Sequence, residues 1–443
     1  MKTFFRSLLA ATLLTAPVAA ASAQTAPVAS AAASDTARII LDASVVNAVN
    51  TQSYFLFRQA VQPLIKQMRG KKVVALGEGT HGTAEFYKLR FWLTRVLMED
   101  EGFNQVALEN TYADCYRLNQ AMHSATIDDL KPLMKKHLLS IWQNRETEEM
   151  LNWMHTYNTS HLRKVELTGI DGMFGTTAAE VLREQLATAT PEVKALTEQL
   201  VQRTQYQDKV WVDLNDRSIP FKRPEMLANG WAGYEATEQL EKALTNVKLT
   251  QRQRPVVAGA LKNLHHYFDT FYQPKVNKQE SSRDSLMAEM TRFLVRDKGS
   301  KVIVWAHDAH VSRRLAVPGD NNGGGTGKFL ERMFPGQYFV LGTTTATGTV
   351  AATKHRFISA ASPMAAYPLE APVAGSWEAS LQALTPPVFY LNTSQLQAQD
   401  VRRGHRLVGY SPESGKNSYF PFKLSEAYDV MLFVRTTTAA TPL

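Results

Sequence analysis

The chain has 443 residues, of which 44% are hydrophobic and 20% are charged. This composition is typical of a globular protein with a large buried core. The formal net charge is +8, but the basic residues are scattered and form no stripe interleaved with aromatic residues, so no nucleic-acid partner is expected.

The N-terminal residues predict export. Lys2 and Arg6 precede a short apolar run of small residues, and Ala21-Ser22-Ala23 matches an A-x-A cleavage site. Because a membrane-spanning helix needs ~20 apolar residues, cleavage is favoured over a membrane anchor, and no membrane contact is expected after cleavage. The expected organisation is a signal peptide over 1–23, a flexible linker over 24–37 and one domain over 38–443, in a protein that is periplasmic or secreted.

Seven short runs along the chain predict β-strands. Most are continuously apolar, which indicates strands covered on both faces. Helical patterns lie between them, so we expect an α/β fold with a mainly parallel central sheet and flanking helices. Residues from about 126 to 284 contain one strand-like run, which predicts a mostly helical insertion. The seven runs are residues 72–76, 105–108, 165–170, 301–306, 338–343, 388–392 and 430–435.

Ionisable side chains follow four of these runs. The carboxyl ends of parallel strands meet at one edge of a sheet, where ligands bind in open α/β folds. Charges there are costly to bury without partners, so we expect one shared site. Four separate helix caps or ion pairs are the alternative. The residues are Glu78 and His81 after the first run, Glu109 after the second, Asp171 after the third, and His307 with His310 after the fourth.

The turn from Gly77 to Gly82, with the sequence GEGTHG, also matches the G-x-G-x-x-G pattern of dinucleotide-binding proteins. Glu78 would place a negative charge beside a pyrophosphate, and Glu109 lies beyond the ~20 residues expected for a ribose contact. We therefore read the glycines as a tight turn that exposes Glu78 and His81. Neither a G-x-S-x-G nor an H-E-x-x-H motif occurs, so a serine-esterase elbow and a zincin are not indicated.

Arg90 falls within the apolar face of the helix predicted after this turn, four residues after Phe86 and three before Leu93. A guanidinium in such a position stays charged and needs a carboxylate partner, for which Glu78 and Glu109 are the candidates. An arginine at the edge of the apolar face, with its head group in water, is the alternative.

These residues lie in stretches that resemble the erythromycin esterase family, in the family's order and over most of the chain. The resemblance implies an α/β fold with helical excursions and hydrolysis of a macrolactone ester without a metal. The matching stretches are GEGTHGTAEFYKLR from Gly77, VALEN from Val106, NWMHTYN from Asn152, SRDSLMAEM from Ser282, WAHDAHV from Trp305 and GKFLERMFPGQYFVLG from Gly327. The resemblance places the family's essential histidine at His81, and its other site positions at Glu78, Arg90, Glu109, His307 and His310.

We expect water to attack the carbonyl of an ester or macrolactone with His81 as the general base. Glu78 or Glu109 would orient His81, as carboxylates do for catalytic imidazoles. Arg90, together with one of the two late histidines, would stabilise the oxyanion or protonate the leaving alkoxide.

Asp171 and Arg283 are assigned to binding of the small-molecule substrate. No cofactor and no metal are expected. Two alternatives stay open: a metal-dependent hydrolase that uses the same histidines and carboxylates as ligands, and an exported protein that binds a lactone or carbohydrate without turning it over.

Overall fold

The computed structural model describes residues 41–124, 126, 129–213, 223–272, 282–314, 325–354 and 364–443. The expected signal peptide and linker, residues 1–37, lie outside the described residues. Across the described ranges, no helix is long and apolar enough to cross a membrane.

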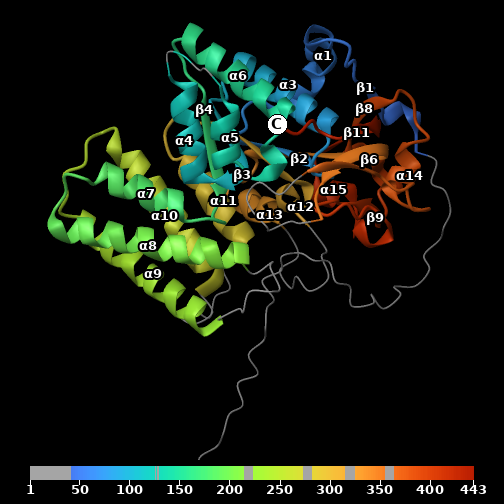
Figure 1. Cartoon of the computed structure of the whole chain (residues 1–443). Coiled ribbons are helices and arrows are strands. Elements are labelled where there is room, and N and C mark those ends of the chain that lie inside the picture. The colour runs from blue at the N-terminus through green and yellow to red at the C-terminus, as the bar shows by residue number, and fades with distance from the viewer. Residues whose placement is uncertain are drawn as a thin grey trace, which may run out of the picture. The chain divides into compact units, whose positions relative to one another are not determined.

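A nine-stranded sheet lies at the centre of the described structure (Figure 1). Its strand order is β1-β8-β11-β6-β2-β5-β3-β4, with β7 paired to β6 outside this path. The strands from β11 to β4 run parallel, whereas β1, β7 and β8 join antiparallel. The strands of this sheet are β1 (Asn47–Ala48), β2 (Val73–Glu78), β3 (Gln105–Thr111), β4 (Glu166–Asp171), β5 (Val302–His307), β6 (Tyr338–Ala352), β7 (Ala365–Pro368), β8 (Val388–Asn392) and β11 (Val430–Thr437). A second sheet pairs β9 (Arg403–Arg406) with β10 (Tyr419–Phe422).

Helices connect most of these strands. The longer ones are α1 (Tyr54–Ala60), α2 (Gln62–Met68), α3 (Ala84–Glu101), α4 (Tyr112–Met122), α5 (Lys131–His137), α6 (Arg145–Ser160), α7 (Thr176–Gln185), α8 (Pro191–Asp213), α9 (Arg223–Leu244), α10 (Gln253–Tyr272), α11 (Arg283–Leu294) and α13 (Thr326–Met333). The shorter ones are α12 (Asp308–Val311), α14 (Trp377–Leu381) and α15 (Leu424–Ala427), with 3-10 turns at Ala43–Val45, Ser140–Trp142, Thr393–Gln399 and Lys416–Ser418.

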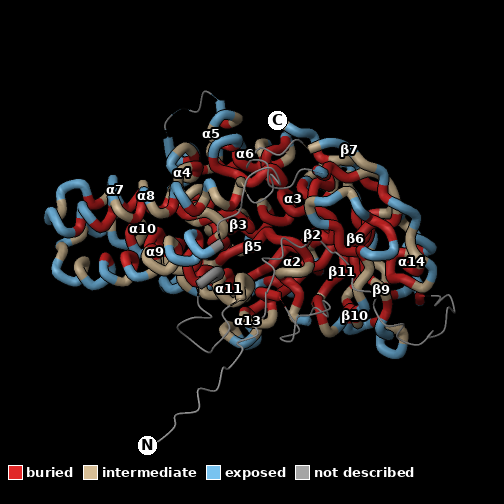
Figure 2. The backbone as a smooth tube through the Cα atoms, turned by 60° about the horizontal axis from the view of Figure 1, so that its bottom comes forward, coloured by how far each residue is buried: buried red, intermediate tan, exposed pale blue. Residues whose placement is uncertain are grey.

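All seven predicted runs are strands of the central sheet, so the α/β prediction is confirmed. Both faces of the sheet are covered, as continuous apolar runs require. In β2, Val74 and Leu76 pack on the face that also holds α3 and α6, whereas Val73 and Ala75 pack on the face that holds α11 and α13. The strands are accordingly buried along most of their length (Figure 2). The sequence missed β1, β7, β9 and β10, which are short and, in β9, polar.

The expected helical insertion divides into parts with different packing. Helices α5 and α6 pack together with α3 on one face of the sheet. Strand β4 is part of the sheet itself. Helices α7 to α10 have an apolar core of their own and lie beside the end of the sheet that carries β4 (Figure 1). The four-helix part is therefore attached at the end of the sheet that carries Asp171.

Candidate active site

The order β2-β5-β3-β4 brings the carboxyl ends of four parallel strands together. Glu78, the last residue of β2, is in register with His307, the last residue of β5. The register between β3 and β4 shifts between Leu108 and Thr111, a stretch that includes Glu109, and pairing resumes where Thr111 pairs with Asp171. The shared edge predicted from the sequence is therefore present.

Two glycines shape the turn after β2. A Cβ atom on Gly77 would overlap Asp308 Oδ1, so only glycine allows that close approach. Gly82 has φ +70°, a left-handed conformation that side chains other than glycine adopt rarely. Glu78 and His81 are three residues apart in the sequence, and this turn brings their side chains into contact.

Glu78 holds two partners at once. Its Oε1 lies 2.7 Å from His81 Nδ1, and its Oε2 accepts a 2.6 Å hydrogen bond from Arg90 Nη2. Arg90 is fully buried, and its guanidinium lies 4.6 Å from the centre of the Trp305 ring. The carboxylate partner of Arg90 is thus Glu78 and not Glu109, and an arginine reaching into water from the edge of the helix is excluded.

His307 lies against His81, with 4.7 Å between ring centres. The backbone uses both ring nitrogens of His307: Nδ1 accepts from Ala309 N at 3.2 Å, and Nε2 lies 3.2 Å from Val408 O. Val408 O also accepts a 2.9 Å hydrogen bond from His81 N. Burial, and then the neighbouring His81, holds the pKa of His307 well below its ordinary value. A neutral His307 that donates from Nε2 fits this environment.

A second group of charges lies next to it. Arg283, the first residue of α11, donates to Asp171 at 2.6 Å and to Glu109 Oε1 at 2.8 Å. His310 lies between Asp284, 2.7 Å from its Nδ1, and Glu109, 3.3 Å from its Nε2. About a quarter of the Arg283 side chain is exposed, so this group retains contact with solvent.

His310 is cationic at neutral pH. Burial lowers its pKa, but the carboxylates of Asp284 and Glu109 outweigh burial and raise the pKa to about 10. A doubly protonated ring cannot accept from Arg283 Nη1, which lies 3.1 Å from Nε2. Arg283 and His310 are therefore two cations in contact. The carboxylates of Glu109, Asp171 and Asp284 offset the repulsion between them. Burial likewise works against charge on Glu109, but His310 and then Arg283 hold its pKa well below the ordinary value.

Glu109 joins the two groups, because its Oε2 accepts from His307 N at 2.9 Å while Oε1 meets Arg283. All eight residues that the sequence proposed for the site thus belong to one connected set of contacts. We define the His81 half of the site as Glu78, His81, Arg90 and His307, and the Arg283 half as Glu109, Asp171, Arg283, Asp284 and His310.

The sequence reasoning missed several residues that contact this site or support it, among them Asp284, Val408, Tyr410 and His405. Asp284 had a signal, since it follows Arg283 within the SRDSLMAEM stretch. Val408 contributes only backbone atoms, which no sequence pattern reveals. Tyr410, whose ring centre lies 5.5 Å from that of His81, and His405 come from a polar segment near the C-terminus that reaches the site only through the tertiary fold.

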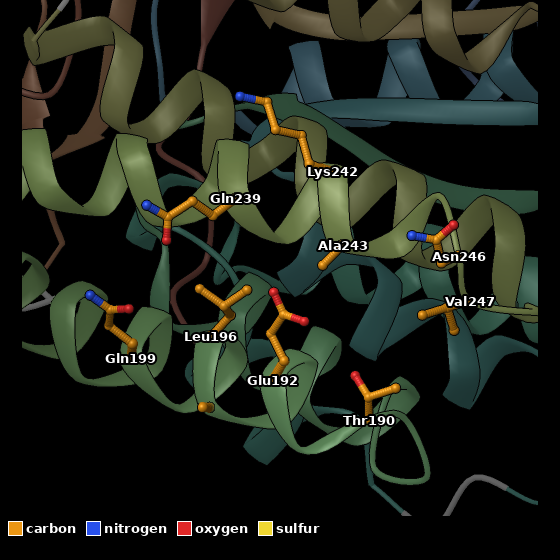
Figure 3. Close-up of a pocket in the computed structure, with 10 residues that line it drawn as sticks. Thr190, Glu192, Leu196, Gln199, Gln239, Lys242, Ala243, Asn246 and Val247 are labelled. Atoms are coloured by element: carbon orange, nitrogen blue, oxygen red, sulfur yellow. The ribbon is translucent and has the colours of Figure 1, made fainter.

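Metal-ligand geometry occurs elsewhere in the described residues. The one grouping of at least three ligand side chains with atoms close enough for a common ion is Glu238, Glu241 and His265, in α9 and α10. A pocket of about 690 Å³ between α8 and α9 is lined by residues such as Glu192, Gln239 and Lys242 (Figure 3). Neither feature includes a residue of the site described above.

A buried histidine held by a carboxylate thus lies beside an arginine–carboxylate cluster at the carboxyl edge of a parallel sheet, an arrangement of side chains that can support acid–base chemistry. The chain belongs to the erythromycin esterase family, whose model matches residues 98–437. The match begins within α3, so the turn with Glu78 and His81 precedes it.

The chain is similar to individual members of this family. It is 34% identical to erythromycin esterase type II of Escherichia coli over 110 residues, which is 25% of this chain and 26% of that protein. It is 25% identical to erythromycin esterase type I of Escherichia coli over 278 residues, which is 56% of this chain and 64% of that protein. The matches thus span less than two thirds of either relative. The fold is similar to that of a mutant of erythromycin esterase EreC in its open conformation, with a TM-score of 0.65, 18% identity, and coverage of 86% of this chain and 95% of that chain.

Proposed function

We propose that this protein is an exported hydrolase that cleaves an ester or macrolactone with water. The observation that carries the proposal is the 2.7 Å contact between Glu78 Oε1 and His81 Nδ1. A carboxylate that accepts from Nδ1–H leaves the lone pair of Nε2 available as a base. Among the described residues, none forms a hydrogen bond with His81 Nε2.

The proposed reaction assigns a role to each of these charged groups. His81 Nε2 takes a proton from water as the water oxygen attacks the carbonyl carbon, and the carbonyl electron pair moves to its oxygen. The cations of the Arg283 half stabilise this oxyanion. When the carbonyl re-forms, the bond to the alkoxide breaks, and the alkoxide takes the proton from His81. The products are a carboxylic acid and an alcohol, which stay in one molecule when the substrate is a lactone.

Two residues take different roles from those expected. Arg90 was expected to act on the oxyanion or the leaving group, but it is fully buried and bonded to Glu78. Arg90 is therefore a positioning residue, since its hydrogen bond holds the Glu78 carboxylate against His81 Nδ1. His307 has both ring nitrogens on the backbone, so the electrophilic role falls to His310 with Arg283.

The substrate class and the location rest on separate observations. The two relatives from Escherichia coli are named for the cleavage of erythromycin, which supports a macrolactone or a related ester. Lys2, Arg6 and Ala21-Ser22-Ala23 support export through a cleaved signal peptide.

The test is hydrolysis by the chain that starts at Gln24. It would be incubated with a panel of lactones, including erythromycin, and simple esters, with and without a strong chelator. We expect turnover of at least one ester, and we expect it to survive chelation. Loss of turnover on chelation, restored by zinc or manganese, would instead support a metal-dependent hydrolase. Binding of a lactone without turnover would support the non-catalytic alternative.

The residue test compares His81→Gln with His123→Gln. Glutamine can hydrogen-bond to water but cannot take its proton, so His81→Gln should lower kcat by roughly 10²–10⁴-fold. His123 is a matched control, because it forms a comparable 2.9 Å pair with Glu166, at the amino end of β4. Circular dichroism would check that both variants fold. A folded His81→Gln variant with kcat near that of the unsubstituted protein would exclude His81 as the base.

A further inference from the structure

A second carboxylate–histidine group lies behind the turn that carries His81. It comprises Glu378 in α14, His405 in β9 and Asp308 at the start of α12, all fully buried. His405 Nδ1 lies 2.9 Å from Glu378 Oε1, and His405 Nε2 lies 3.6 Å from Asp308 Oδ2. No part of the hydrolysis scheme uses these three side chains.

This group carries charge in the protein interior. Burial lowers the pKa of His405, but the neighbouring carboxylates of Asp308 and Glu378 outweigh burial and raise the pKa to about 9. Burial also raises the pKa of Asp308, against the lowering effect of His405. Burial works against charge on Glu378 as well, yet His405 and the backbone of Arg406 hold its pKa below the ordinary value. Buried ion pairs of this kind add little net stability compared with apolar side chains of the same volume. Their presence therefore calls for a role other than overall stability.

Asp308 connects the group to the turn. Its Oδ2 accepts a 3.0 Å hydrogen bond from Thr343 N. The hydroxyl of Thr343 in turn accepts from Gly79 N at 3.1 Å and donates to Gly77 O at 3.4 Å. Asp308 Oδ1 also packs against Gly77 so closely that no Cβ fits there. Thr343 thus forms hydrogen bonds with the backbone on both sides of Glu78, and Asp308 packs against Gly77 and binds Thr343 N.

His405 connects the same group to the opposite side of the turn. Three residues after it, Val408 N donates to Gly79 O at 2.8 Å, and Val408 O accepts from His81 N at 2.9 Å. The same carbonyl meets Nε2 of His307. An attraction between His405 and Asp308 therefore draws the segment that carries Val408 against the turn and against the end of β5.

We propose that Glu378, His405 and Asp308 form a buried ionic brace that fixes the position of His81. The brace holds the Gly77–His81 turn between Thr343 and Val408, so that Glu78 meets Nδ1 and Nε2 faces the substrate. The three residues are positioning residues and do not touch the substrate. The inference rests on the proposed function for its kinetic consequence, but its structural consequence for His81 can be measured separately.

The kinetic test uses His405→Gln and Asp308→Asn, which keep side-chain volume and remove charge. A misplacement of the base affects the chemical step more than binding, so kcat should fall about 10–100-fold with little change in KM. His123→Gln removes a comparable pair at the surface and should leave kcat unchanged. Thermal unfolding would establish that each variant folds, and Glu378→Gln provides a third variant if one of the two does not.

The structural test is histidine-selective ¹⁵N NMR of the same variants. The Nδ1–H signal of His81, assigned by its absence in His81→Gln, reports the contact with Glu78. It should shift or broaden in His405→Gln and Asp308→Asn and stay in place in His123→Gln. This readout needs no substrate, so the brace can stand even if no ester is hydrolysed. Folded brace variants with an unchanged His81 signal and unchanged kcat would overturn the inference.

Discussion

Buried histidines in the two halves of the site have pKa values shifted in opposite directions. His307 and His310 are three residues apart at the end of β5, yet the pKa of His307 lies well below the ordinary value and that of His310 rises to about 10. His307 meets backbone groups and another imidazole, whereas His310 meets two carboxylates. Burial is common to both, so the partners decide the charge. The His81 half is thereby suited to accept a proton, and the Arg283 half is suited to stabilise an anion.

The strongest test of this division is Arg283→Met. Removal of the guanidinium takes away one of the two cations proposed to stabilise the oxyanion. It also leaves Asp171 without its cation and Glu109 with His310 alone. We expect kcat/KM to fall roughly 10²–10³-fold. Arg283→Lys should recover only part of this loss, because an ammonium cannot reproduce the forked contacts with two carboxylates.

The matched control for Arg283 is Arg292→Met on the same helix. Arg292 is 61% exposed and pairs with Glu289 at the surface, so its loss should leave kcat/KM unchanged within about twofold. The measurement is steady-state kinetics on one ester for all three variants. If Arg283→Met is folded and as active as Arg292→Met, the Arg283 half has no role in oxyanion stabilisation.

A smaller effect should separate His307 from His310. In His307→Gln, the side-chain amide can still accept from one backbone group and donate to another, so activity should fall less than about threefold. His310→Gln removes a cation between Asp284 and Glu109. Loss of one charge-assisted hydrogen bond of about 1.5 kcal/mol corresponds to roughly a tenfold fall in kcat. Equal losses in the two variants would show that the charge difference between these histidines has no catalytic consequence.

The smallest effect concerns stability at alkaline pH. The folded-state pKa values of His310, about 10, and His405, about 9, lie above the value of ~6.5 for an unperturbed histidine. The stability from protonation is therefore complete below pH ~6.5 and is lost as the pH rises through about 9 to 10. We expect the urea midpoint to fall between pH 7 and pH ~9.5, and to fall less in His310→Gln and His405→Gln.

A surface pair supplies the reference for this pH dependence. Glu166 also raises the pKa of His123, but both side chains are partly exposed, and solvent screens such pairs. His123→Gln should therefore keep the alkaline decline of the unsubstituted protein. A decline of the same size in His310→Gln and His405→Gln would contradict the link between these buried cations and stability.

The sheet was predictable because its strands are covered on both faces and therefore read as continuous apolar runs, as in Val73–Leu76 and Val302–Ala306. The short strands β7 and β9 have no such pattern, since AAYP and RGHR contain few large apolar residues. The sequence predicts the insertion as one unit because it shows where helices lie but not which core each helix joins. Both α6 and α8 bury apolar residues at helical spacing. The apolar residues of α6 pack against the sheet, whereas those of α8 pack in the separate helical core.

For the site, the sequence by itself determined which side chains follow the strand ends, because the carboxyl ends of parallel strands meet at one edge. That rule placed Glu78, Glu109, Asp171 and His307 together. Only the tertiary structure decided the pairing and the charge of each group. Arg90 bonds Glu78 and not Glu109, and His405 reaches Asp308 across 97 positions of sequence. Pairing and pKa depend on distances of a few ångströms and on burial, and these quantities arise only when segments far apart in the chain pack together.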